Sequence, residues 1–209
     1  KQNLIQPSTI TQVTMESVSF KYNDHVVVDD VSLDINLGDI VLFTGPSGEG
    51  KSTVLKAIYR GMEINKGKVI LDSENISALS RYKIPKIRQK IGMIFQDFKL
   101  LEDRTVFENI ALPLRIEGIQ NKIVIESVKE ALHKVSLSGT EKYYPLQLSG
   151  GEQQRISIAR ALVKKPKIIL ADEPTGNLDP NISDEILDLL EICTNEGSTV
   201  LMSTHNFPL

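Results

Sequence analysis

Hydrophobic and polar residues near the start of the chain alternate with the period of β-strands. Val31, Leu33 and Ile35 are separated by single polar residues, the spacing of a half-buried strand. Val13–Met15 indicates an earlier strand, and Asn23–Asp24 supplies a turn between the two. We therefore expect a small antiparallel sheet in the N-terminal part of the chain.

Short apolar runs alternate with helical patterns in most of the remaining chain. Ile40–Phe43, Ile168–Ala171 and Thr199–Ser203 have the length and composition of buried strands. The helices predicted beside them are Val54–Ile58, Ile156–Val163 and Ile186–Cys193. Strands that alternate with helices indicate an α/β fold with a parallel sheet covered on both faces.

The middle of the chain has a different pattern. Between about Asp97 and Gln147, apolar residues recur at helical spacing, as in the series Val124, Val128 and Ala131. The length of 209 residues suits one domain. We therefore expect one domain over residues 1–209, in which residues 1–96 and 148–209 form the α/β core with its antiparallel part, and residues 97–147 form a helical insertion.

Composition excludes several classes of protein. Apolar and charged residues make up 41% and 24% of the chain, the proportions of a globular protein. The formal net charge of −3 lacks the basic excess usual in nucleic-acid binders. No apolar run is long enough to span a bilayer and no signal-peptide pattern opens the chain, so any membrane association is expected through a partner. The single cysteine, Cys193, has helical spacing with apolar neighbours, which predicts a buried thiol.

A glycine-rich loop follows the strand Ile40–Phe43. Gly45–Ser52 matches the phosphate-loop pattern G-x-x-x-x-G-K-[ST] in full, and a predicted helix follows it. Glycines let backbone N–H groups converge on phosphate oxygens, Lys51 reaches the β- and γ-phosphates, and the Ser52 hydroxyl ligates Mg²⁺. The residues expected around the nucleotide here are Gly45, Pro46, Ser47, Gly48, Glu49, Gly50, Lys51, Ser52 and Thr53.

Two carboxylates end the apolar strand Ile168–Ala171. Ligands gather at the carboxyl ends of parallel strands, so we expect Asp172 to hold Mg²⁺, directly or through water. Glu173 is expected to orient and polarise the water that attacks the γ-phosphate. By itself such a pair is more often a helix cap or a solvated strand end, and the preceding phosphate loop favours the catalytic interpretation.

A second glycine motif indicates which class of phosphate-loop protein the chain belongs to. Leu148–Gln153 reads Leu-Ser-Gly-Gly-Glu-Gln, which resembles the signature of ABC-type ATPases with Glu in the fifth place. A helix is predicted directly after the motif, and the N-terminus of a helix favours an anion. A small-molecule kinase, which a phosphate loop alone would allow, does not carry this signature.

The resemblance to ABC ATPases covers nearly the whole chain and implies roles for further residues. Tyr22 would stack on adenine, although alone it reads as an ordinary strand aromatic. Gln96 would meet Mg²⁺ and the attacking water, and His205 would contact the γ-phosphate. Asp179 matches the family's D-loop. Glu49 departs from the pattern, since a small residue is commoner there, and we expect its side chain to point away from the phosphates.

The resemblance also implies that one copy is incomplete. In the family two copies pack head to tail, so that Ser149, Gly150, Gly151 and Glu152 of one copy face the ATP held by Gly45–Ser52 of the other. ATP closes this homodimer, and hydrolysis opens it. Chemistry at the nucleotide is thereby coupled to a rigid-body motion.

Four stretches resemble one branch of the family, whose ATPases serve cell division, lipoprotein release and macrolide export. Thr175–Asp179 resembles the branch as a whole, and Lys56–Arg60, Phe95–Leu101 and above all Asp103–Asn109 are similar to the cell-division members. The resemblance implies a cytoplasmic ATPase held at the inner membrane face by an integral membrane subunit, with Phe98–Phe107 as the docking segment. Transport ATPases of the same branch remain the alternative, and apolar residues of Phe98–Phe107 could instead be core. An ABC ATPase acting on DNA or ribosomes would have a basic surface or long insertions.

Overall fold

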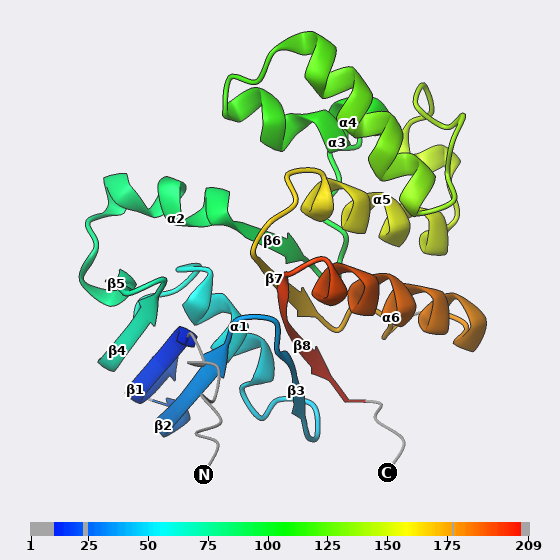
Figure 1. Ribbon diagram of the computed structural model, residues 1–209. Helices are drawn as coiled ribbons and strands as arrows, with labels where there is room; N and C mark the ends of the chain where they lie inside the picture. The colour runs from blue at the N-terminus through cyan, green and yellow to red at the C-terminus, as the bar shows by residue number, and fades with distance from the viewer. Residues whose placement is uncertain (1–10, 23–24, 177, 206–209) are drawn as a thin grey trace, which may run out of the picture.

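The computed structural model describes residues 11–22, 25–176 and 178–205, and for Tyr22 it describes the backbone only. The strands and α-helices within these ranges, all shown in Figure 1, are β1 (Thr11–Tyr22), β2 (His25–Asn36), β3 (Ile40–Thr44), α1 (Lys51–Ile58), β4 (Lys66–Leu71), β5 (Glu74–Asn75), α2 (Ile84–Lys90), β6 (Ile91–Ile94), α3 (Val106–Ile116), α4 (Asn121–Lys134), α5 (Gly150–Leu162), β7 (Ile168–Asp172), α6 (Pro180–Asn195) and β8 (Thr199–Thr204).

The first sheet is antiparallel and has the strand order β2-β1-β4-β5. In its β1–β2 pair, Val13 lies opposite Ile35 and Met15 opposite Leu33. The antiparallel pairing expected from the alternating residues is therefore confirmed. The turn predicted at Asn23–Asp24 lies outside the described residues.

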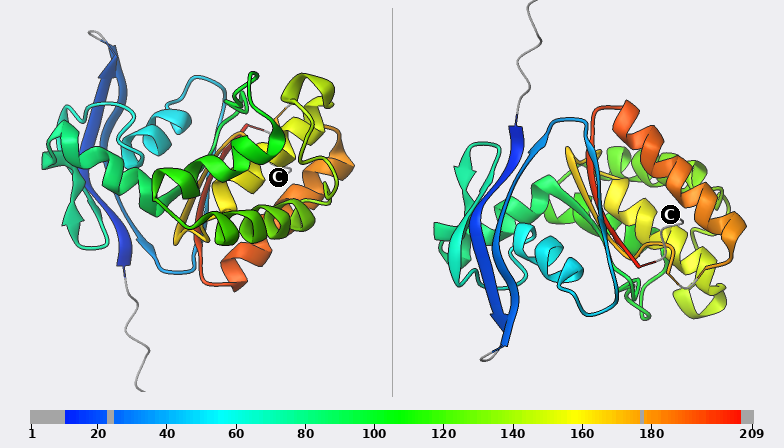
Figure 2. Two further views of the ribbon diagram at one scale, coloured as in Figure 1. Left: turned by 90° about the horizontal axis from the view of Figure 1, so that it is seen from above. Right: turned by 90° about the horizontal axis from the view of Figure 1, so that it is seen from below.

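The second sheet is parallel, with the order β3-β8-β7-β6. Alternate residues of its strands enter two different cores, because successive side chains of a strand point to opposite faces. Leu170 and Leu201 pack with α1 and the antiparallel sheet, whereas Val200 and Met202 pack with the helices of the other face. Figure 2 shows the parallel sheet between the antiparallel sheet on one side and α5 and α6 on the other. The prediction of a parallel sheet covered on both faces is confirmed.

Helices α3 and α4 form a lobe that packs on α5 (Figure 1). Ile110 of α3 and Val128 of α4 belong to the same continuous core as Ile156 of α5 and Ile169 of β7. The lobe therefore shares its core with the parallel sheet. No helix within the described ranges has the length and apolar character needed to cross a membrane.

The loop that enters this lobe is held by polar contacts. Thr105 caps α3 in a capping box with Glu108, which satisfies two N–H groups at the start of the helix. Asn109 is fully buried, and its amide binds the backbone of Leu101 in both directions and the carbonyls of Arg104 and Thr105. Thr105, Glu108 and Asn109 belong to the stretch Asp103–Asn109 used for the branch resemblance, so part of that stretch has a structural role.

Candidate functional site

The loop between β3 and α1 folds as the phosphate-loop pattern predicts. Gly50 precedes α1 with φ = +86°, and a Cβ there would lie 2.7 Å from Cγ2 of Val28 and 3.0 Å from the Val27 carbonyl oxygen. Only glycine fits this conformation in this space. Lys51 is buried, and its Nζ donates to the carbonyls of Gly45 at 2.7 Å and Pro46 at 2.6 Å. The ammonium group therefore lies within the curve of the loop, while Ser47, Gly48 and Glu49 are exposed.

Glu49 lies close to the start of the loop, and the expectation that it points away from the phosphates stays a prediction. Its carboxylate curls back toward Gly45, where a Cβ would lie 2.6 Å from Glu49 Oε2. The absence of a side chain on Gly45 leaves room for this arrangement. A negative charge therefore lies beside Gly45, the first residue of the loop.

Ser52 and Asp172 meet at the carboxyl ends of the parallel strands. The Ser52 hydroxyl donates to Asp172 Oδ1 at 2.6 Å, and the Ser203 hydroxyl donates to the same oxygen at 2.8 Å. The next residue of α1, Thr53, is partly buried. No group of three His, Cys, Asp or Glu side chains suited to a metal occurs within the described ranges. One hydroxyl and one carboxylate nevertheless fit Mg²⁺, which is usually bound by one or two protein oxygens together with phosphates and waters.

Glu173 lies at the centre of a second group of polar side chains. Its Oε2 accepts a hydrogen bond from Gln96 Nε2 at 2.9 Å, and its Oε1 lies 3.2 Å from His205 Nδ1. The Glu173 backbone has φ = +46°, an uncommon conformation for a residue with a side chain, and its N–H donates to both oxygens of Ser203. Three residues from distant parts of the chain are thus brought together.

The signature motif starts α5. Ser149 is the N-cap, and its hydroxyl and N–H both donate to Glu152 Oε2 at 2.8 Å in a capping box. These bonds from Ser149 lower the pKa of Glu152. A capping box accepts Glu or Gln at this position, which explains why Glu can replace the family's usual Gln. Gly151 approaches α6 closely, since a Cβ there would lie 2.9 Å from Ile182 Cδ1, whereas a Cβ on Gly150 would meet no atom within 4 Å.

The remaining predicted residues lie in different places. Asp179 caps α6, with its Oδ1 accepting from the Ile182 N–H at 3.2 Å. The side chain of Tyr22 is outside the described part of the structure, so its stacking on adenine stays a prediction. Among the described residues, no hydrogen bond or ion pair joins Ser149–Gly151 to the Gly45–Ser52 loop.

Polar contacts of two residues, Ser203 and Gln154, were not predicted from the sequence. Ser203 binds both Asp172 and the Glu173 backbone, and Gln154 of α5 donates from Nε2 to the Pro174 carbonyl at 2.8 Å. Gln154 thereby connects the signature helix to the turn that follows Glu173. A single Ser or Gln outside a motif gives no signal in a sequence, because its role depends on the strand or turn beside it.

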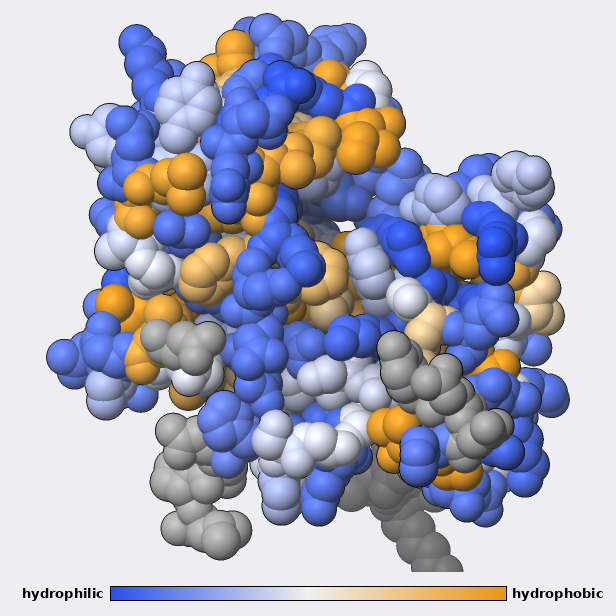
Figure 3. All heavy atoms as spheres, turned by 180° about the vertical axis from the view of Figure 1, so that it is seen from behind, coloured by the Kyte–Doolittle hydropathy of each residue, from blue (hydrophilic) through white to orange (hydrophobic). Residues whose placement is uncertain are grey.

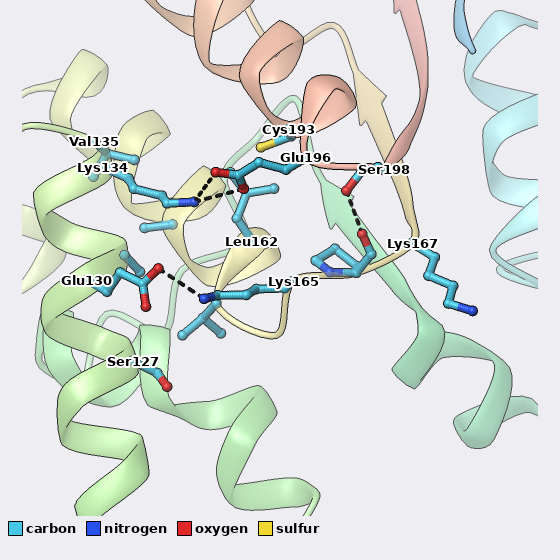
Figure 4. Close-up of a pocket in the computed structure, with 15 residues that line it drawn as sticks. Ser127, Glu130, Lys134, Val135, Leu162, Lys165, Lys167, Cys193, Glu196 and Ser198 are labelled. Atoms are coloured by element: carbon cyan, nitrogen blue, oxygen red, sulfur yellow. Dashed lines mark hydrogen bonds and ion pairs between the residues drawn. The ribbon is translucent and has the colours of Figure 1, made fainter. Parts of the chain in front are cut away.

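A cavity of about 550 Å³ lies between α4, α5 and the end of α6 (Figure 4). Ion pairs cross it from Lys134 to Glu196 at 3.0 Å and from Lys165 to Glu130 at 3.1 Å. Cys193 lines it as the buried thiol that the sequence predicted, and burial raises its pKa. The cavity adjoins the residues before β7 and β8, at the end of the sheet opposite the phosphate loop, so it is not the nucleotide site.

A strand–loop–helix unit with a buried Lys51, an acidic pair at the end of β7 and a capped glycine motif define a phosphate-loop ATPase. Residues 28–176 match the family model described as ABC transporter, and the chain belongs to this family. It is an ATPase of the ABC type, as the sequence predicted. Its fold is that of the ABC nucleotide-binding cassette, with an antiparallel sheet beside a parallel one.

Several curated relatives share one name. The chain is 45% identical to the cell division ATP-binding protein FtsE of Bacillus subtilis, over 93% of this chain and 86% of that protein. It is also 45% identical to the FtsE protein of Escherichia coli strain K12, over 94% of this chain and 89% of that one. The resemblance to the cell-division branch is therefore confirmed.

Solved structures with the same fold are ABC cassettes. The dimeric structure of the cassette MJ0796 has a TM-score of 0.86 and 36% identity, over 93% of this chain and 88% of that chain. A second dimeric structure of MJ0796, in a post-hydrolysis state bound to ADP and phosphate, matches with the same values.

Proposed function

We propose that this chain is the FtsE-type ATP-binding and ATP-hydrolysing subunit of a membrane ABC complex that acts in cell division. ATP-driven closure of a homodimer would control peptidoglycan hydrolysis through an integral membrane partner similar to FtsX. The observation that carries the proposal is the convergence of Gln96 and His205 on Glu173, next to the Ser52–Asp172 pair. An ATPase for lipoprotein release or macrolide export is the alternative, and the names of the relatives favour cell division.

The phosphate loop would bind ATP through its backbone N–H groups and Lys51. The ammonium group already lies among loop carbonyls, so it needs only a small movement to bind the β- and γ-phosphates. Ser52 and Asp172 would hold Mg²⁺, with Gln96 reaching it from the end of β6. When bound, Mg²⁺ neutralises charge that develops on the phosphates.

Glu173 would act on the attacking water. Its two carboxylate oxygens are contacted by different groups, Gln96 and His205, so the carboxylate is held from both sides. The Ser203 contacts to its backbone N–H fix the residue in its uncommon conformation. A carboxylate held in this way can orient a water for attack on the γ-phosphate, and His205 can contact the γ-phosphate.

A second copy would complete the site. Gly150 is exposed, and no atom of the described residues would lie within 4 Å of a Cβ at that position. The need for glycine there is therefore explained by the close approach of another molecule, in agreement with the dimeric MJ0796 cassettes. Ser149 and the N-terminus of α5 would then contribute to binding the γ-phosphate of the partner's ATP.

Glu173→Gln tests the assigned chemistry. We expect this variant to lose ATP hydrolysis, to retain ATP binding, and to elute as a dimer with ATP and Mg²⁺ in size-exclusion chromatography. Lys51→Ala should instead weaken nucleotide binding and show no ATP-induced dimer. Hydrolysis by the Glu173→Gln variant at the wild-type rate would remove Glu173 from its proposed role.

The membrane partner would dock beside the Gln96 loop. A cavity of about 370 Å³ lies between α2, the end of β6, α3 and α5, and Lys99, Leu112 and Ile116 are among the residues that line it. Figure 3 shows this hollow between α2 and the lobe formed by α3 and α4. Apolar side chains lie along the side that belongs to that lobe. Ile116 is 65% exposed. Within the predicted segment Phe98–Phe107, by contrast, apolar side chains such as Leu100 pack against the core.

The docking site can be tested with matched substitutions. Ile116→Glu and Lys99→Glu should weaken co-purification of the membrane subunit and leave ATP binding unchanged. Ile192→Glu, at an exposed isoleucine of α6, is the control and should retain the subunit. If all three variants co-purified the subunit equally well, docking at this cavity would be wrong. Recovery of a transporter subunit in place of an FtsX-like one would favour the alternative function.

A further inference from the structure

The segment Arg81–Lys90, which we call the basic segment, has a charge unlike the rest of the chain. It carries five basic residues and no acidic one, whereas the whole chain has a formal net charge of −3. The segment forms a 3₁₀ turn at Arg81–Lys83 followed by α2. Its basic residues are Arg81, Lys83, Lys86, Arg88 and Lys90.

Two of the five cations are engaged within the molecule. Arg88 donates to the carbonyls of Tyr59 and Arg60, and its guanidinium lies 4.8 Å from the centre of the Tyr59 ring. Lys90 lies 3.9 Å from Asp72 and 3.8 Å from Glu74. These two residues therefore hold α2 in place.

The other three cations are free to bind a partner. Arg81 lies 3.3 Å from Glu63, but both side chains are more than four-fifths exposed, and such surface pairs contribute little. Within the described ranges no carboxylate pairs with Lys83 or Lys86, and both side chains are exposed. Arg81, Lys83 and Lys86 thus present a positive surface at the edge of the molecule.

An aromatic side chain stands among these cations. Tyr82 is 95% exposed, although a tyrosine ring has a large apolar area. Tyrosine is enriched at the interface between membrane and water, where the ring lies at the level of the lipid headgroups and the hydroxyl is hydrated. An exposed ring between Arg81 and Lys83 therefore combines the two interactions that a membrane surface offers.

We propose that the basic segment binds the surface of a membrane that contains anionic lipids, with Tyr82 at the level of the headgroups. Helix α2 lies on the side of the molecule where α3 and α4 also lie (Figure 1), and Pro85 and Arg88 border the 370 Å³ cavity. The segment would contact lipid directly, in addition to the attachment through a partner that is proposed above. The proposal does not depend on the function proposed above.

A nucleic acid is the other polyanion that the cations could bind. Duplex binders usually show a basic stripe along one face, because they must follow the phosphate backbone. Here the positive surface is one short segment of a chain with net negative charge. A planar bilayer can contact such a segment alone, and it also accommodates the tyrosine ring.

Vesicle co-sedimentation of the full chain tests the proposal. The wild type should sediment with vesicles of about one-third phosphatidylglycerol in phosphatidylcholine, and not with phosphatidylcholine alone, since each Lys or Arg near an anionic surface strengthens binding roughly fivefold. Lys83→Glu/Lys86→Glu should lower the partition coefficient by at least about tenfold. The control Lys21→Glu/Lys167→Glu changes the net charge equally at exposed positions of β1 and of the turn before β7, and it should bind as the wild type does.

Tyr82→Trp gives a second readout, because the chain contains no tryptophan. The emission of this single tryptophan should shift to shorter wavelength with the anionic vesicles and stay unchanged with phosphatidylcholine. Equal binding to both kinds of vesicle, equal loss in the control variant, or an unchanged emission would overturn the proposal. Tighter binding to a DNA duplex than to vesicles, with the same dependence on Lys83 and Lys86, would assign the segment to nucleic acid instead.

Discussion

The Ser203 hydroxyl contacts both residues of the acidic pair at the end of β7. It donates to Asp172 Oδ1 at 2.8 Å and accepts from the Glu173 N–H at 3.1 Å. Because the hydroxyl is fully buried, both contacts are shielded from water. The proposed metal ligand and the proposed catalytic carboxylate, although adjacent in sequence, are therefore directed to different tasks by a residue of the neighbouring strand.

Glu49 gives the first prediction at this scale. Its carboxylate curls back over Gly45, so it should repel a bound phosphate. Glu49→Gln keeps the shape and removes the charge, and we expect it to bind ADP roughly fivefold more tightly at low salt, the effect of about 1 kcal/mol of repulsion across water. Displacement of a fluorescent nucleotide at two salt concentrations would measure this.

A second charge-removing variant is the control for this measurement of ADP affinity. Lys56→Gln removes a charge at an exposed position of α1 outside the loop and should leave ADP affinity nearly unchanged. The gain in Glu49→Gln should shrink as salt is added, since screening weakens the repulsion. An affinity equal to that of the wild type at low salt would mean that the carboxylate turns away when nucleotide binds.

The start of α5 carries the prediction at the scale of an element. Glu152 accepts two bonds from Ser149, and these lower its pKa. Glu152→Ala removes the capping box and should lower the free energy of unfolding by about 1 kcal/mol, whereas Glu152→Gln should retain most of it. Urea unfolding of the three proteins at neutral pH would measure the difference.

The pH dependence of this cap has a definite sign. A carboxyl whose pKa is lower in the folded state stabilises the fold above its unfolded pKa and loses that effect as pH falls through the folded pKa. The advantage of the wild type over Glu152→Ala should therefore be largest near neutral pH and shrink in acid. An advantage that stayed constant down to the acid transition would show that the ionised carboxylate is not what caps the helix.

The elements differ in how far their sequences predict them. β7 and β8 are continuous apolar runs and were found, because both of their faces are buried. β4, α2 and β6 were not predicted: the first begins Lys-Gly-Lys, and the other two have only seven and four residues. Helix α5 begins at Gly150, six residues before its predicted start, because its first turn is built from the glycine motif.

The residues of the site also differ in how far the sequence predicts them. The phosphate loop and the acidic pair are local patterns with a clear physical purpose, so the sequence was sufficient to locate them. Gln96 and His205 give no such signal and were assigned only through resemblance, since their meeting at Glu173 depends on the order of the strands. Buried contacts such as that of Gln154 with Pro174 become visible only when the turn and the helix lie side by side.

At the scale of the whole molecule, the two glycine motifs define a prediction about assembly. In a two-fold symmetric dimer each interface contact occurs twice, so each proposed site pairs the Lys51 loop of one copy with the Ser149 motif of the other. Lys51→Ala disables the first part and Ser149→Arg the second. Each variant alone should be inactive, because all of its sites contain the defect.

Mixing the two variants should restore activity. In a mixed dimer one site combines both defects, and the other combines an intact Lys51 loop with an intact Ser149 motif. A mixed dimer has one complete site of its two, so ATP hydrolysis should return to at most about half of the wild-type rate. Mixed dimers captured through two different tags but without any hydrolysis would contradict the composite site, whereas Lys51→Ala mixed with Glu173→Gln/Ser149→Arg should stay inactive, because its only complete site lacks the carboxylate.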